Sequence, residues 1–193
     1  MRKQFLVFLA LSALCGCAEY PEYPDADTLS VEFVQPSVWG TGSWFSVHFP
    51  ASQLCQAEGG QGKTPTLYVS GIPDEANLIL LEINDVSDPA LAHNGGLGTI
   101  GFYHNENEET QVLLPVSGGV SVFPEKERLY AFKEKTNRVN ESKGFAYYPP
   151  CKQRGGKYYA TVKAVRRTGA FDTQKTEILA VGSIYLGKHI DTY

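Results

Sequence analysis

Apolar and polar side chains alternate over several short stretches of the chain. Leu29, Val31 and Phe33 are separated by polar residues, and the same alternation returns over residues 45–49. A period of two is typical of strands that bury one face. The pattern therefore predicts a mainly β fold. Further strands are expected over residues 66–70, 78–83, 99–104 and 158–164, with a last strand or strand pair over 178–186, interrupted by Gly182.

One stretch has the spacing of a helix instead. Pro124 precedes residues 125–135, in which Leu129 and Phe132 lie three residues apart. Proline is favourable at the first position of a helix, and a spacing of three places two side chains on one helical face. We therefore expect a short peripheral helix here.

Composition agrees with a chain of strands and tight turns. Hydrophobic residues make up 42% and aromatic residues 12%, with 19 glycines and 11 prolines. This favours a β-rich chain over a helical bundle, and the length suits one domain with a substantial core. The longest apolar run beyond the N-terminal region, residues 78–81, is strand-sized and is followed by Glu82, so it does not predict a membrane span.

The N-terminus resembles the export signal of bacterial lipoproteins. Arg2 and Lys3 precede an apolar run over residues 5–14, which is too short to span a bilayer as a mature helix. The run ends in Leu14-Cys15-Gly16-Cys17, which resembles a lipobox with Cys17 as the first mature residue.

This resemblance implies an envelope location. Residues 1–16 are then a signal peptide, Cys17 carries the acyl chains that bind the protein to a membrane, and residues 17–28, rich in proline and acids, form a tether. Ala18 is not the aspartate that retains many lipoproteins at the inner membrane. We therefore expect an outer-membrane lipoprotein with its domain in the periplasm or at the surface; an ordinary cleaved signal that releases a soluble protein is the alternative.

The net charge of the chain argues against nucleic acid as a partner. The chain has 17 Lys plus Arg and 21 Asp plus Glu, and loss of residues 1–16 removes Arg2 and Lys3 but no acid, which leaves 15 against 21. Nucleic-acid binding depends on a surplus of basic residues. The mature chain has none, so no nucleic-acid partner is expected.

Cys55 and Cys151 remain once Cys15 leaves with the signal peptide and Cys17 is acylated. An exported chain meets an oxidising compartment, where two remaining cysteines favour a disulfide. Two independent buried thiols are the alternative.

Motifs of catalysis are missing from the sequence. It contains no Gly-x-Ser-x-Gly, no His-Glu-x-x-His and no phosphate-binding glycine loop before a helix, and its four histidines lack metal-ligand spacing. Asp85 ends an apolar strand, where it can be either a pocket carboxylate or the cap of a turn. We predict that the protein is not an enzyme and has no cofactor or metal.

Four stretches, in order, resemble the bacterial branch of the phosphatidylethanolamine-binding protein family. The resemblance implies a β-sandwich over residues 29–193, with two sheets rich in antiparallel strands, short peripheral helices and one small anion pocket at a sheet end. Cys55 and Cys151 fall near positions where bacterial members carry cysteines. The four stretches are Thr-Pro-Thr-Leu-Tyr-Val-Ser-Gly-Ile-Pro at 64–73, Asp-Val-Ser-Asp-Pro at 85–89, Gly-Phe-Ala-Tyr-Tyr-Pro-Pro at 144–150, and residues 157–164.

The family's pocket motifs are degenerate here. Asp85 matches the first aspartate of the family's Asp-Pro-Asp-x-Pro motif, and Ser87 replaces the second. Residues 96–100 lack the expected histidine, and Gly-Lys-Tyr ending in Tyr158 replaces His-Arg-Tyr. Two missing histidines remove donors that an anion would need. The candidate pocket implied by the resemblance consists of Asp85, Ser87, Tyr148, Lys157 and Tyr158.

Together these features predict a non-catalytic binding module of the bacterial envelope. Its partner is expected to be a small anionic or polar ligand, or another envelope protein. The alternative is a structural or assembly subunit of a cell-surface complex that has kept the fold without a working anion pocket.

Overall fold

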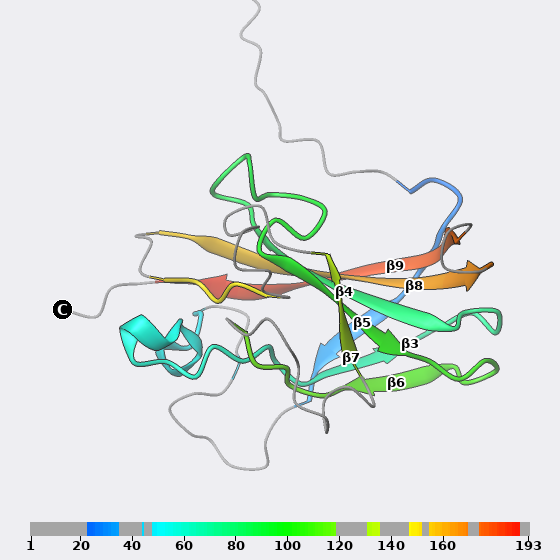
Figure 1. Ribbon diagram of the computed structural model, residues 1–193, viewed down its shortest axis with the longest axis horizontal. Coiled ribbons are helices and arrows are strands. Elements are labelled where there is room, and N and C mark those ends of the chain that lie inside the picture. The colour runs from blue at the N-terminus through cyan, green and yellow to red at the C-terminus, as the bar shows by residue number, and fades with distance from the viewer. Residues whose placement is uncertain are drawn as a thin grey trace, which may run out of the picture.

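Two β-sheets face each other across a shared core in the computed structural model (Figure 1). The structure describes residues 23–34, 44, 48–118, 131–135, 147–151, 155–169 and 174–189, and only the backbone of 131–135. The predicted signal peptide, Cys17, residues 45–47 of one predicted strand and residues 125–130 of the predicted helix lie outside this part of the chain.

The larger sheet has six strands in the order β1-β9-β8-β4-β5-β7, and the smaller sheet has three in the order β2-β3-β6. All neighbours are antiparallel except β1, which lies parallel to β9. The strands are β1 Asp27–Thr28, β2 Ser30–Phe33, β3 Leu67–Ser70, β4 Leu78–Asp85, β5 Gly98–Tyr103, β6 Thr110–Leu113, β7 Ala131–Lys135, β8 Lys157–Thr168 and β9 Lys175–Lys188. The predicted mainly β fold with two antiparallel-rich sheets is confirmed.

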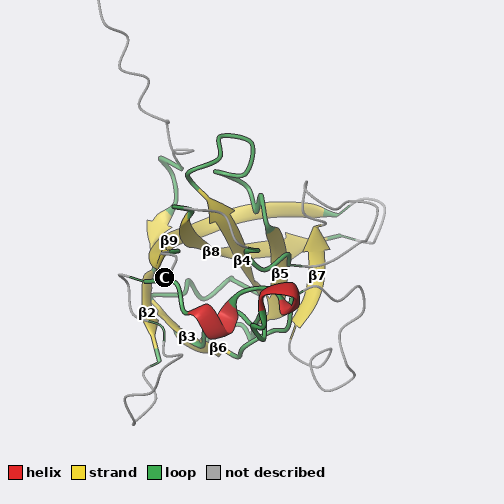
Figure 2. Ribbon diagram, turned by 90° about the vertical axis from the view of Figure 1, so that its left-hand side faces the viewer, coloured by secondary structure: helices red, strands yellow, loops and turns green. Residues whose placement is uncertain are grey.

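The core fills the space between the sheets because alternate residues of each strand point inward. Ile79, Leu81 and Ile83 of β4 are fully buried there, together with Leu67 and Val69 of β3. The helical elements of the described residues are two 3-10 turns, η1 Ala51–Gln53 and η2 Gln56–Glu58, which lie beside the smaller sheet (Figure 2).

Strand β4 is buried on both faces. Leu78 and Leu80, which point away from the main core, form a second small apolar cluster with Val165. Glu82 and Asn84 point to the same outer face and are also buried. At β4, the outer face of the larger sheet is therefore covered by other parts of the chain.

The prediction of a helix over residues 125–135 is wrong for the part that the structure describes. Ala131–Lys135 forms β7, which pairs antiparallel with β5. The three-residue spacing of Leu129 and Phe132 fits a helix, but the predicted helix over residues 125–135 is short enough to be only marginally stable by local propensity alone. Pairing with β5 satisfies their backbone groups and sets the strand conformation.

Gly182 does not interrupt the last strand, because β9 runs from Lys175 to Lys188 as a single strand. A Cβ at Gly182 would lie 2.6 Å from the backbone oxygen of Leu29 and 2.8 Å from Cγ2 of Val31. The glycine is therefore a point of close approach, where the segment between β1 and β2 crosses β9.

The domain contacts part of the segment that was predicted to be a tether. Asp27 and Thr28 form β1 on the edge of the larger sheet, and the ring of Tyr23 lies 4.9 Å from Nζ of Lys163. Among the described residues, none forms a helix long and apolar enough to cross a membrane.

Candidate ligand-binding site

A cavity of about 230 Å³ lies where β4 ends and β8 begins. Asp85, the last residue of β4, pairs with Tyr158 near the start of β8, so strand register alone brings these two residues together. The lining residues are Asp85, Leu91, Leu97, Tyr148, Pro150, Cys151 and Tyr158. Three of the five predicted pocket residues thus line one cavity.

The carboxylate of Asp85 both lines the cavity and caps a turn, the two roles that the sequence left open. Asp85 is 1% exposed and lines the cavity. Its Oδ1 also accepts hydrogen bonds from the backbone N–H of Ser87, at 3.0 Å, and from the Ser87 hydroxyl. The turn after β4 therefore fixes the orientation of the carboxylate that faces the cavity.

Tyr158 supplies a phenol that stays protonated. Its side chain is 1% exposed and packs edge-on against Phe49, with ring centroids 5.0 Å apart. Burial raises the pKa of the Tyr158 hydroxyl well above its usual range, and the charge of Asp85 raises it further. The hydroxyl is therefore a hydrogen-bond donor throughout the physiological pH range.

Gly156 leaves room for the tip of the Tyr158 ring. A Cβ at this position would lie 2.2 Å from Oη and 2.6 Å from Cζ of Tyr158. Because Tyr158 is buried, its tip has little space to move. We expect Gly156→Ala to lower the free energy of unfolding by about 1–3 kcal/mol, the usual cost of overpacking.

Urea denaturation of Gly156→Ala checks this prediction, with Lys157→Ala as the control because the Lys157 side chain is exposed. The control should match the parent protein. Equal stability of Gly156→Ala and the control would contradict the close packing.

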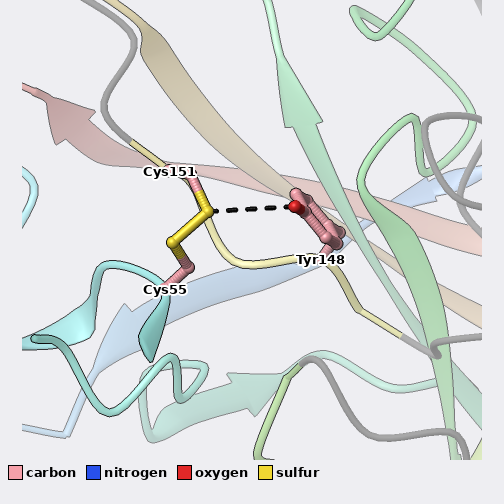
Figure 3. Close-up of a disulfide and its surroundings, with 3 residues drawn as sticks. All are labelled: Cys55, Tyr148 and Cys151. Carbon is pink, nitrogen blue, oxygen red and sulfur yellow. Dashed lines mark hydrogen bonds between the residues drawn. A yellow bond between two sulfur atoms is a disulfide. The ribbon is translucent and has the colours of Figure 1, made fainter. Parts of the chain in front are cut away.

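Tyr148 lies beside the disulfide that closes this part of the fold (Figure 3). Sγ of Cys55 and Sγ of Cys151 are 2.03 Å apart, which confirms the predicted pair and excludes independent thiols. Oη of Tyr148 lies 3.9 Å from Sγ of Cys151 and donates the contact, since a disulfide sulfur carries no proton. Backbone hydrogen bonds from Cys55 N to Pro150 O, at 2.9 Å, and from Tyr148 N to Leu97 O, at 2.7 Å, hold the same segment.

Ser87 and Lys157 do not line the cavity. The backbone N–H of Lys157 donates to Oγ of Ser87 at 3.4 Å, and its carbonyl accepts from Val86 N at 2.9 Å, while its side chain is exposed. The two residues brace the turn that holds Asp85. The prediction missed Leu91 and Leu97, because apolar residues in loops carry no chemical pattern that marks them as a pocket wall.

The chemistry of the cavity follows from its lining. Asp85 is the charged group among the described lining residues, and the phenols of Tyr148 and Tyr158 add polar tips to otherwise apolar walls. Within the same part of the chain, no three His, Cys, Asp or Glu side chains are grouped so as to hold a metal ion. Such an arrangement suits a small ligand that presents a positive charge or hydrogen-bond donors.

The fold is similar to that of a solved structure, whereas sequence comparisons find no match. No family model matches the chain, and no curated protein matches it. The chain is similar to a crystal structure from Chlamydia trachomatis described as a homolog of phosphatidylethanolamine-binding protein, with 18% identity, 86% of this chain and 100% of that chain covered, and a TM-score of 0.45. That description names the family that the four sequence stretches resemble. At this identity and TM-score, the similarity gives no information about what the cavity binds.

Proposed function

We propose that this protein is a non-catalytic binding module that holds a small amine or ammonium group in the Asp85 cavity. The observation that carries the proposal is a buried carboxylate, oriented by Ser87, in a cavity whose described lining contains no basic side chain. A negative charge in a confined, poorly hydrated site repels anions and attracts cations. The cavity therefore favours a cationic ligand over the anionic ligand that the family resemblance implies.

The absence of catalysis is part of the proposal. General acid–base or nucleophilic chemistry uses a reactive group with a positioned partner within hydrogen-bond reach. Asp85 accepts hydrogen bonds from Ser87, which lies in the same turn and does not line the cavity, so the Ser87 hydroxyl does not face a bound ligand. This arrangement supports binding, since it fixes the orientation of the carboxylate.

The envelope location belongs to the same proposal and rests on the lipobox-like residues 14–17. If Cys17 is the anchored residue, the contact of Tyr23 with the domain leaves only six residue steps between them. An extended chain spans roughly 3.5 Å per residue, so the domain would stay within about 20 Å of the point where Cys17 enters the membrane. The part of the domain that Tyr23 contacts would then lie close to the bilayer surface.

Replacing Asp85 by asparagine tests the proposal. Asparagine keeps an Oδ1 acceptor for Ser87 and removes only the charge. In thermal denaturation, we expect ethanolamine and choline to stabilise the parent protein, by about 2.7 kcal/mol at one hundred times their dissociation constant, and phosphate and acetate to leave it unchanged. Asp85→Asn should lose the stabilisation, whereas Lys157→Ala, with its exposed side chain, should keep it.

The opposite pattern would overturn the proposal. Stabilisation by phosphate that is lost in Lys157→Ala would restore the anion pocket that the family resemblance implies. Stabilisation by ethanolamine that persists in Asp85→Asn would place the ligand elsewhere.

A second candidate function is the assembly subunit, and one observation favours it. The outer face of the smaller sheet exposes four large apolar side chains, of which Tyr68 and Val112 pair directly across β3 and β6. Contiguous exposed apolar surface is typical of protein contacts. Failure of all four ligands, together with a defined oligomer that Val112→Lys dissociates in sedimentation, would favour this role. The four side chains are Val34, Tyr68, Val112 and Leu114, with exposed fractions of 43%, 37%, 46% and 49%.

A further inference from the structure

A second, larger cavity of about 440 Å³ lies on the outer face of the six-stranded sheet. Strands β4, β8 and β9 form its floor. Its walls are the segment from Tyr23 to Leu29 and the loop between β4 and β5, which stands above the larger sheet, on the side away from the smaller one (Figure 1). Asn84 lines this cavity and its neighbour Asp85 lines the smaller one, so β4 separates the two sites.

The floor of this outer cavity is a continuous polar row. Glu82 of β4 pairs with Thr161 of β8, and Thr161 pairs with Ser183 of β9. Directly paired residues in antiparallel strands share one face of the sheet, so the three side chains lie side by side. On the opposite face of the same part of these strands the core is apolar, with Leu81 and Val162 fully buried.

The charge in the floor is neutralised within the protein. Nζ of Lys163 lies 2.7 Å from Oε1 of Glu82, and the side chains of Lys163 and Glu82 are 6% and 10% exposed. Burying such a pair is costly, and hydrophobic side chains of similar volume are often as stable or more so. Stability alone therefore does not explain the pair. The Glu82 carboxylate in the floor is balanced by Lys163, and the side chain of His93 also lines the cavity.

Two tyrosines and an oriented amide complete the walls. Tyr159, whose ring lies 4.8 Å from that of Tyr185, and Tyr23 border the cavity and combine a large apolar body with a polar tip. Oδ1 of Asn84 accepts hydrogen bonds from the backbone N–H groups of Gly95, at 2.9 Å, and Gly96, at 3.3 Å. Asn84 thus ties the loop to the sheet and keeps the cavity walls in place.

We propose that the outer cavity binds a neutral saccharide unit. A sugar ring presents many hydroxyl groups without charge and carries apolar C–H faces, which match a row of carboxylate and hydroxyl groups flanked by tyrosines. The volume falls in the range of small-molecule sites. This site is separate from the amine pocket and gives the domain a second binding function.

Saturation-transfer NMR with glucose, N-acetylglucosamine and chitobiose tests the proposal. We expect magnetisation transfer from the parent protein to at least one of these sugars. Thr161→Val keeps the shape of the side chain and removes its hydroxyl, which also accepts a hydrogen bond from Nδ2 of Asn84 at 3.4 Å. Binding should weaken about tenfold, as expected for one lost hydrogen bond. Ser183→Ala removes a hydroxyl at an exposed strand position where folding is not at risk, and it leaves the contact between Asn84 and Thr161 intact.

Asp85→Asn is the matched control, because it lies on the other side of β4 and should leave sugar binding unchanged. Absence of transfer to all three sugars would overturn the proposal, and so would transfer that survives in both Thr161→Val and Ser183→Ala. Sugar binding that fails only in Asp85→Asn would assign the sugar to the smaller cavity and overturn the outer site. These outcomes do not depend on whether ethanolamine binds.

Discussion

Replacing both Cys55 and Cys151 by serine is expected to lower the free energy of unfolding by about 4–5 kcal/mol. The disulfide joins residues 96 positions apart, and closing a loop of that length removes much of the conformational freedom of the unfolded chain. For a domain of this size the loss corresponds to a fall of roughly 10–18 °C in the melting temperature. Thermal and urea denaturation at one pH measure it.

The reduced parent protein is the control for this variant. In the presence of dithiothreitol its stability should approach that of the double variant, because both chains then lack the cross-link. A loss of less than about 1 kcal/mol in the double variant would contradict the entropic account. Because Cys151 lines the small cavity beside Tyr148, ethanolamine binding should weaken together with stability.

The central strands of the fold were predictable because their pattern is local. Strand β8 alternates between inward and outward residues over positions 157–162. The first half of β4 is a short apolar run, as expected for a strand that is buried on both faces. β7 was not predictable in the same way. The sequence of residues 125–135 permits a helix, and the strand depends on a partner, β5, that lies about thirty residues earlier in the chain.

The two cavities also differ in how far the sequence could predict them. Asp85, Tyr148 and Tyr158 were proposed as pocket residues through a family resemblance, and all three line one cavity. The resemblance implied that Lys157 belongs to the pocket, but its side chain is exposed. Lys157 contributes through its backbone N–H, which donates a hydrogen bond to Oγ of Ser87. The outer cavity has no local pattern at all, since its floor exists only in the register of three strands distant in sequence.

Loss of Lys163 alone is expected to destabilise the protein by about 3–5 kcal/mol, because Lys163→Met leaves the buried Glu82 carboxylate without its partner. Lys163→Met combined with Glu82→Met removes both charges and should recover most of this loss. Urea denaturation of the two single variants and the double variant gives the coupling free energy between the side chains. Additive losses would show that the ion pair is not coupled.

The pH dependence of the same variant gives a second test of the ion pair. Burial lowers the pKa of Lys163, but hydrogen bonds and charge interactions with Glu82 and Tyr23 outweigh burial and raise the pKa above its ordinary value of 10.5. The folded protein therefore holds this proton more tightly than the unfolded chain does. The stabilisation is fully present below about pH 10.5, the unfolded value, and is lost as the pH rises through the folded value.

Between pH 8 and 10 the difference in stability between the parent protein and Lys163→Met should be constant, and it should shrink at higher pH. The buried phenols of Tyr147 and Tyr158, whose pKa values burial raises, add their own alkaline loss of stability to both proteins. Subtracting one stability curve from the other removes that shared contribution and isolates Lys163. A difference that stays constant to pH 11.5 would mean that Glu82 and Tyr23 do not favour the charged lysine in the folded state.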